Sequence, residues 1–204
     1  GWLALRAFGV AMLVFLLLPI LVIVPLSFSA SSFLAYPMPG WSLQWYENLF
    51  TSAEWARAAK NSFIVAPAAT VIATVLGTLT AVGLARVQFP GKGLLMSVLI
   101  APMVVPIVVV GVATYLFFAR IGLSDSYTGL ILVHAALGAP FVVTTVLATL
   151  QGFNHNLVRA SLACGASPLT TFFRVTLPVI APGVISGALF AFATSFDEVV
   201  VTLF

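Results

Sequence analysis

Charged side chains are scarce in this sequence. Of its 204 residues, 62% are hydrophobic and only 6% are charged, with 8 Lys and Arg and 5 Asp and Glu. A soluble domain carries roughly a quarter of its residues as charges, because its surface must be solvated by water. So few charges cannot cover a soluble surface of this size, and we predict that lipid surrounds most of the chain.

Metal ligands and disulfide partners are equally rare. The single cysteine, Cys164, excludes an intrachain disulfide framework. The two histidines, His134 and His155, lie far from each other in the sequence, so we predict no protein metal site and no bound cofactor. For His134 we favour a buried, hydrogen-bonded structural role over a proton relay.

Signatures of catalysis are missing as well. Gly91-Lys92-Gly93 lacks the spacing of a phosphate-binding loop, so this chain does not bind and hydrolyse ATP by that motif. No set of carboxylates, Ser–His pair or nucleophile elbow indicates a membrane enzyme. The formal net charge is +3, but no basic cluster indicates nucleic acid as a partner.

What the sequence has instead is five long uncharged stretches. About 20 residues cross the hydrocarbon core as a helix, and lipid leaves helices as the way to satisfy the backbone. We predict an all-α polytopic membrane bundle, a single domain over 1–204, with spans at Ala7–Ala30, Ser62–Ala85, Leu94–Ala119, Tyr127–Leu150 and Pro178–Phe196. The first stretch is too long for a cleaved signal peptide. Because the sequence begins at Gly1, we expect N-terminal residues to be missing.

The charges between the spans predict the orientation. One side carries only basic residues, and the other carries all the acidic ones. The positive-inside rule puts the basic side in the cytoplasm, with the N-terminus. The basic side holds Arg6, Arg86, Lys92, Arg159 and Arg174.

The outer segment before the second span has two parts. Tyr36–Gly40 contains two prolines and a glycine and predicts a turn. Ser42–Ala59 then has the pattern of an amphipathic helix, within an outer segment 41–59 whose aromatic residues suit the membrane interface. We favour membrane anchoring for these rings over ligand binding.

Proline and glycine within the spans predict bends and close helix contacts. Pro102 and Pro106 can bend the third span, because each removes a backbone donor. Gly183 and Gly187 form a GxxxG pair that allows a neighbouring helix to approach closely. For the aromatic residues of the third span we favour core packing over a cavity: Tyr115, Phe117 and Phe118.

The cytoplasmic segment 154–177 is longer than a connection between two spans requires. Leu157–Cys164 predicts a short helix and Gly165 a break. Ser167 before Pro168 is a typical helix start, so we predict a second short helix at Leu169–Val175. Two short helices meeting at a glycine indicate a docking element for a soluble partner, and the alternative is an amphipathic loop resting on the membrane.

This segment resembles the EAA loop of ABC importer permeases. That pattern has Glu-Ala-Ala, three residues and a glycine, followed later by a hydrophobic residue, any residue, Leu and Pro. Ala160, Gly165, Leu177 and Pro178 are in register, but Arg159 stands in place of the glutamate and Ser161 in place of the second alanine. The Gly165–Pro168 run and the ending from Ser195 to Val201 are similar to spermidine/putrescine-type permeases.

The resemblance implies a type I importer permease working by alternating access. Its implied partners are a second permease subunit, two ATP-binding subunits that use ATP and Mg²⁺, an external solute-binding protein, and the lipid of a bacterial inner membrane. The residues implied in contact with the ATPase are Arg159, Ala160, Ser161, Gly165, Ala166, Ser167, Pro168, Leu177 and Pro178. The implied solute is a polyamine such as putrescine or spermidine. Iron, thiamine or another organic ion is the alternative solute.

Asp197 and Glu198 follow the last apolar run. Carboxylates at a membrane margin need solvent, a partner or a cavity. Our hypothesis is that one of them lines the substrate pathway, and the alternative is a solvated helix end. The sequence stops at Phe204, so we expect the sixth span of the family to be missing, with Val199–Phe204 either beginning it or finishing the fifth.

Two classes of protein compete with an importer permease. An ion-coupled secondary transporter or channel would carry charges within several spans, and the first four predicted spans have none. A membrane-embedded enzyme would need clustered catalytic residues, which are missing. Binding of a separate ATPase separates the permease from both.

Overall fold

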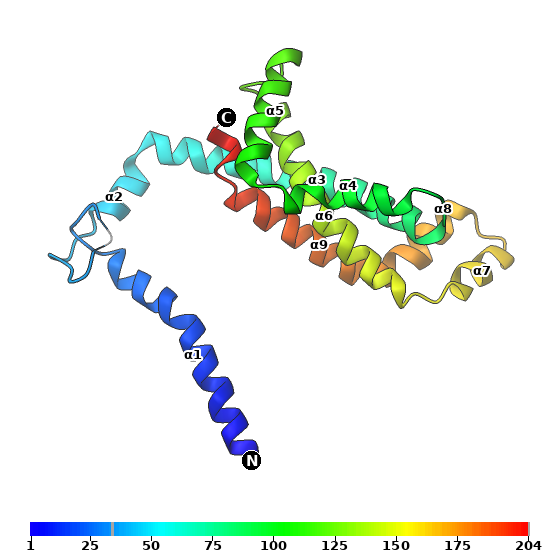
Figure 1. Ribbon diagram of the computed structural model, residues 1–204, viewed down its shortest axis with the longest axis horizontal. Coiled ribbons are helices and arrows are strands. Elements are labelled where there is room, and N and C mark those ends of the chain that lie inside the picture. The colour runs from blue at the N-terminus through cyan, green and yellow to red at the C-terminus, as the bar shows by residue number, and fades with distance from the viewer. Residues whose placement is uncertain (34, 204) are drawn as a thin grey trace. The chain divides into compact units, whose positions relative to one another are not determined.

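The computed structural model describes residues 1–33 and 35–203, and its regular elements are helices (Figure 1). The all-helical prediction is therefore confirmed. The chain divides into two compact units, residues 1–60 and residues 61–204.

The first unit begins with the apolar helix α1, Trp2–Leu26, in which no residue is buried. Its 25 residues are long enough to cross a membrane at 1.5 Å per residue. Arg6 is its one charged side chain and lies over the ring of Trp2, 3.5 Å from the ring centroid. Such a helix requires lipid or another protein around it.

Hydrogen bonds and ring contacts fold the chain back after α1. Ser29 forms a bridge with Trp41, and Trp45 donates from Nε1 to the Ser29 carbonyl at 2.9 Å. The Ser27 and Tyr46 hydroxyls lie 2.8 Å apart, and the ring of Phe28 stacks on that of Tyr46. This segment is therefore a folded element rather than a free loop.

The predicted single helix over Ser42–Ala59 is wrong in its extent. The helix α2 spans Gln44–Thr51 and stops at Ser52, whose ψ of 124° is extended. The hydroxyl of Ser52 accepts from the amide of Glu54, which begins the next helix. That helix, α3, runs from Ala53 to Arg86 without interruption. The second span therefore has a polar N-terminal extension, which the charge pattern of the sequence did not indicate.

The third predicted span is broken. Helix α4, Lys92–Val104, and helix α5, Ile107–Ile121, meet at an angle of 105°. Val105 is extended because a residue before proline disfavours the helical region, and Pro106 is then the N-cap of α5. The bend expected from the prolines is confirmed, and it is sharp enough that neither half alone, at about 20 Å, crosses the hydrocarbon core.

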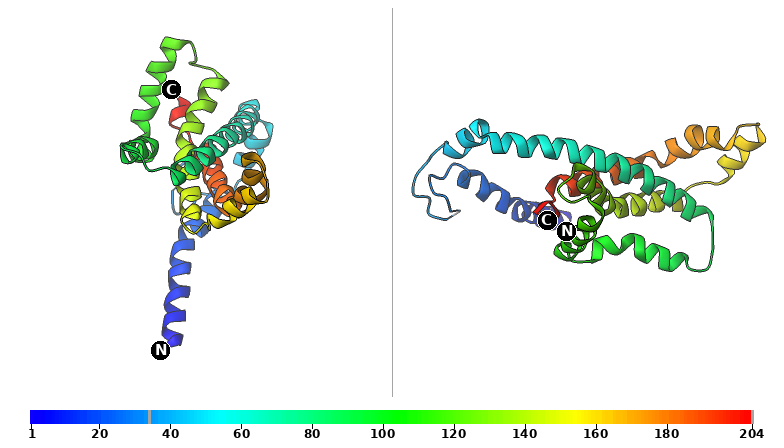
Figure 2. Two further views of the ribbon diagram at one scale, coloured as in Figure 1. Left: turned by 90° about the vertical axis from the view of Figure 1, so that its right-hand side faces the viewer. Right: turned by 90° about the horizontal axis from the view of Figure 1, so that it is seen from above.

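Helices α3, α6 (Tyr127–Gln151) and α9 (Leu177–Asp197) form the core of the second unit (Figures 1 and 2). The helices approach closely where side chains are small. A methyl group added at Gly138 of α6 would lie 2.9 Å from the Cβ of Ala191 in α9. The buried residues of this core are Ala73, Ala81, Val82, Val142, Val146, Leu150, Phe153, Ile180 and Ala191.

The GxxxG pair performs the predicted role. A methyl group added at Gly187 would lie 2.7 Å from the Cα of Val142, and one added at Gly183 would collide with the side chain of Thr149. Both glycines are buried in α9 against α6. They therefore allow the two backbones to approach more closely than any larger residue would permit.

In the described part of the chain, four helices are long and apolar enough to span a membrane, or five if α4 and α5 count as one bent span. The last of these spans along the chain is the continuous run from Pro168 to Asp197. Beyond it, residues Val201–Leu203 form a 3₁₀ turn, η2, and Phe204 lies outside the described residues.

We expect Gly187→Ala or Gly183→Ala to lower the thermal unfolding midpoint of the purified protein in detergent. Overpacking a well-filled contact costs about 1–3 kcal/mol. Gly83→Ala is the matched control, since an added methyl there meets nothing within 4 Å. A midpoint that falls equally in all three variants would contradict the close contact of α6 and α9.

Candidate functional site: a glycine-hinged segment and an acidic helix end

The segment after α6 forms two short helices that meet at a glycine. Helix α7 spans Asn156–Ala163, and helix α8 spans Pro168–Thr171. Gly165 has a φ of +83° between them. Its amide donates to the Leu162 carbonyl, and the Ala166 amide donates to the Ser161 carbonyl, which together make a Schellman ending for α7.

Helix α8 starts as the sequence predicts. The Ser167 hydroxyl accepts from the amide of Thr170 at 3.2 Å, and Pro168 follows at the first helical position. The hydroxyls of Ser161 and Thr171 lie 3.0 Å apart and connect α7 to the end of α8. The two helices are therefore held together by a hydroxyl contact as well as by the turn.

The predicted separate helix over Leu169–Val175 is corrected. After α8 the chain continues through a π-helical turn, η1 (Phe172–Thr176), directly into α9. Leu177 and Pro178 begin α9 rather than leading into it. Pro178 has no amide to donate to the preceding turn, and the wider π turn lies immediately before it. The segment is thus continuous with the last span.

Apolar side chains on this segment face outward. Arg159, Ala160 and Gly165 are exposed, and Ser161 and Ala166 are half-buried. The large exposed apolar side chains lie on both short helices and on the π turn: Leu157, Leu162, Leu169 and Phe173. Exposed apolar side chains beside an arginine suit contact with a protein partner or with the membrane surface.

The acidic pair lies at the other end of α9, and its two members differ. Asp197 is the last residue of α9 and is exposed. Glu198 is half-buried, and its Oε1 accepts from the amide of Val201 at 2.8 Å. Glu198 therefore stabilises the turn η2, whereas the side chain of Asp197 is exposed at the end of the helix.

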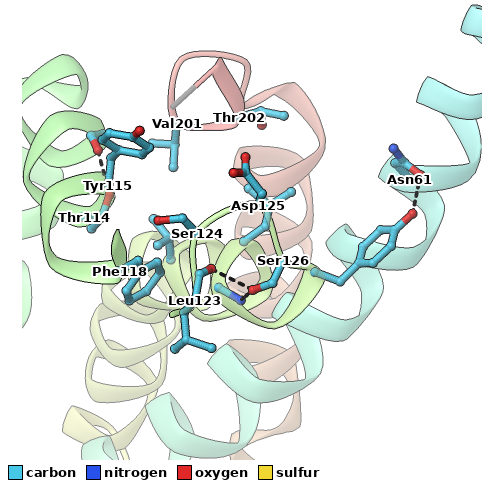
Figure 3. Close-up of a pocket in the computed structure, with 15 residues that line it drawn as sticks. Asn61, Thr114, Tyr115, Phe118, Leu123, Ser124, Asp125, Ser126, Val201 and Thr202 are labelled. Carbon is cyan, nitrogen blue, oxygen red and sulfur yellow. Dashed lines mark hydrogen bonds between the residues drawn. The ribbon is translucent and has the colours of Figure 1, made fainter. Parts of the chain in front are cut away.

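A cavity of about 240 Å³ adjoins this turn (Figure 3). Its wall comes from α5, from the loop before α6, and from η2, and includes Thr114, Tyr115, Phe118, Asp125, Val201 and Thr202. The core-packing prediction is confirmed for Phe118, which packs against Val133, Leu137 and Val201 and also borders the cavity. It was wrong for Tyr115 and Phe117, which are exposed; Tyr115 lines the cavity, and Phe117 lines a second, apolar hollow. Asp125 was not predicted as a site residue, although its place between Ser124 and Ser126 was a signal of a polar loop.

The prediction for His134 is confirmed. Its side chain is buried in α6, and its Nδ1 lies 2.8 Å from the hydroxyl of Ser195 in α9. This contact joins the two helices three residues before Glu198. It therefore supports the end of α9 at which the acidic pair lies.

The family of binding-protein-dependent transport system inner membrane components matches residues 73–204. The chain belongs to this family. The spermidine/putrescine permease PotC of Haemophilus influenzae is 34% identical over 98% of this chain and 77% of its own length. PotC of Escherichia coli is 32% identical over 97% of this chain and 74% of its own length. The putrescine permease PotI of Escherichia coli is 32% identical over 93% of this chain and 70% of its own length.

The permease is thus the non-catalytic, multi-pass inner-membrane component of an ABC importer. Family membership also excludes the ion-coupled transporter and the membrane enzyme as rival classes. The match includes both the glycine-hinged segment and the acidic end of α9, since both lie within residues 73–204.

We expect Glu198→Gln and Glu198→Ala to separate the two possible roles of this residue. Glutamine keeps an oxygen that can accept from Val201, whereas alanine removes it. If Glu198 acts by holding η2, Glu198→Gln retains most ATP-driven uptake in proteoliposomes and Glu198→Ala loses it. Equal loss in both variants would instead indicate that the charge itself is required.

Proposed function

We propose that this permease moves a polyamine, such as putrescine or spermidine, inward by alternating access. The observation that carries the proposal is the similarity over nearly the whole chain to permeases named for these two solutes. The acidic end of α9 supports it, because carboxylates replace water around an ammonium group well. A different small solute, such as iron, thiamine or another organic ion, is the second candidate.

The coupling segment 154–177 is proposed to bind the ATPase. In support, exposed apolar residues lie on both sides of Gly165 in the sequence, and Gly165 is in register with the EAA pattern. Arg159 replaces the glutamate of that pattern, so a salt bridge made by that glutamate has no counterpart in this chain. The apolar surface of α7 and α8 does not depend on that charge.

The proposed assembly pairs this permease with a second permease subunit, identical or paralogous, and with two ATP-binding subunits. The partners bind ATP and Mg²⁺, and this chain binds no cofactor. An external solute-binding protein delivers the solute to the opposite face. Closure of the ATPases would move α7 and α8 as rigid levers, and the outer end of α9 would open.

The proposed orientation places the N-terminus, the loop between α3 and α4, and the coupling segment in the cytoplasm. Basic residues without acidic ones on these segments support it. The bent pair of α4 and α5 counts as one crossing in this topology. The outer segment 41–59 then lies at the opposite interface, where Trp41, Trp45 and Trp55 are exposed and suit the headgroup region.

Replacing Gly165 tests the coupling segment. A side chain at its φ of +83° costs about 1–2 kcal/mol, and asparagine is the residue that tolerates this region best. We expect Gly165→Val to lose most ATP-driven uptake and Gly165→Asn to retain it, with both proteins present in the membrane. An added Cβ meets nothing within 4 Å, so equal loss in both variants would assign the effect to the contact surface instead.

The solute is tested by uptake of radiolabelled putrescine and spermidine in cells that carry the complete operon. We expect uptake that requires ATP and is lost when the ATPase subunit is deleted. Asp197→Asn should reduce it, since the exposed carboxylate at the end of α9 is removed without a change in size. ATP-dependent uptake of another solute, with no polyamine uptake, would contradict the substrate and leave the family unchanged.

A further inference from the structure

The cavity beside η2 has one carboxylate and no cationic side chain in its described wall. Asp125 supplies the carboxylate, and no Lys or Arg lines the space. The loop that carries it connects the end of α5 to the start of α6. The cavity therefore carries a negative charge, and none of the lining residues supplies a positive charge to neutralise it.

The backbone fixes the position of this carboxylate. Asp125 has a φ of +55° and is the one residue other than glycine with a positive φ among those the structure describes. Aspartate tolerates this region better than most side chains. The next residue, Ser126, accepts from the amide of Gly129 and so begins α6 immediately after Asp125. The loop is thus rigidly attached to a buried helix.

Aromatic and hydroxyl groups complete the wall. Figure 3 shows Tyr115 across the space from Asp125, with Val201 and Thr202 above them. The hydroxyl of Ser124 is buried without a hydrogen-bond partner among the described residues. Carboxylate, hydroxyl and aromatic groups are the ones that bind an organic ammonium ion, by charge-assisted hydrogen bonds and by cation–π attraction.

We propose that this cavity binds a primary ammonium group of the transported cation, with Asp125 as its acceptor. The inference rests on the proposed function and names a site for its substrate. Glu198 then acts as a positioning residue, because it holds the turn whose Val201 and Thr202 form part of the wall. Asp125, rather than the acidic pair, makes the direct contact in this cavity.

The test is equilibrium binding of radiolabelled putrescine to the complete permease–ATPase complex in nanodiscs, without the solute-binding protein. We expect Asp125→Asn to weaken binding about tenfold or more, as for loss of a charged hydrogen bond. Asparagine tolerates a positive φ, so the loop keeps its shape. Asp125→Gly also permits this φ and should lose binding to a similar degree.

Two controls isolate the charge. Glu54→Gln removes a carboxylate from the exposed first turn of α3 and should leave binding unchanged. The neutral diol 1,4-butanediol has the length of putrescine without its charge and should not compete with it. Recovery of the variant complexes at wild-type yield, with wild-type basal ATPase activity, shows that assembly is intact.

Binding and uptake separate the two proposals. Unchanged putrescine affinity in both Asp125→Asn and Asp125→Gly would overturn the site, even where polyamine uptake by the wild type is confirmed. Putrescine binding that depends on Asp125, without any polyamine uptake by the wild type, would overturn the substrate and keep an ammonium site. Effective competition by 1,4-butanediol would overturn the ammonium assignment.

Discussion

The close contact of α6 and α9 is the interaction on which the rest of the second unit depends. Gly183 and Gly187 allow α9 to lie against Thr149 and Val142 of α6. Lipid offers no hydrophobic driving force for helix association, so close packing and interhelical polar contacts must hold the bundle. The His134–Ser195 contact is one such polar link, between the same two helices. Both ends of α9 derive their positions from this interface.

A single helical run connects the segment proposed to bind the ATPase with the acidic end of α9. Residues from Pro168 to Asp197 continue through α8, η1 and α9, and at 1.5 Å per residue these 30 residues extend about 45 Å. The coupling segment lies at one end, and Asp197, Glu198 and the cavity lie at the other. In the proposed mechanism, a movement of α8 would be transmitted along this one helical element. The π turn at Phe172–Thr176 is the one irregularity described within that run, and such turns are frequent at functional sites.

Much of this organisation was predictable, because the decisive signals are local. Uncharged length predicts the helices, Ser167-Pro168 predicts the start of α8, and Gly165 predicts the end of α7. The errors arose where two signals overlapped. Charges at Glu54, Arg57 and Lys60 separated the predicted amphipathic helix from the second span, yet a long helix tolerates them beyond the hydrocarbon core, and α3 runs through all three. Likewise, proline predicted a bend at Pro106 but not its angle, since the angle depends on packing that no local pattern encodes.

The cavity was not predictable for a related reason. Tyr115 and Phe118 are aromatic residues of the kind found in cores, and Phe118 does pack against Val133 and Leu137. Both also border the cavity, and they lie in a helix that turns by 105° from α4. In the sequence, Asp125 is an ordinary acidic loop residue, and only the fold places it beside the turn η2. Glu198, in contrast, was predicted from the sequence because it is a carboxylate at the membrane margin. One of its oxygens, however, already accepts a hydrogen bond from the amide of Val201. A carboxylate that already accepts a hydrogen bond from its own backbone offers less to a cation than Asp125, which is exposed and lines the cavity. For the proposed ammonium site, the hydrogen bonds that a carboxylate already makes therefore matter more than its position near the membrane surface.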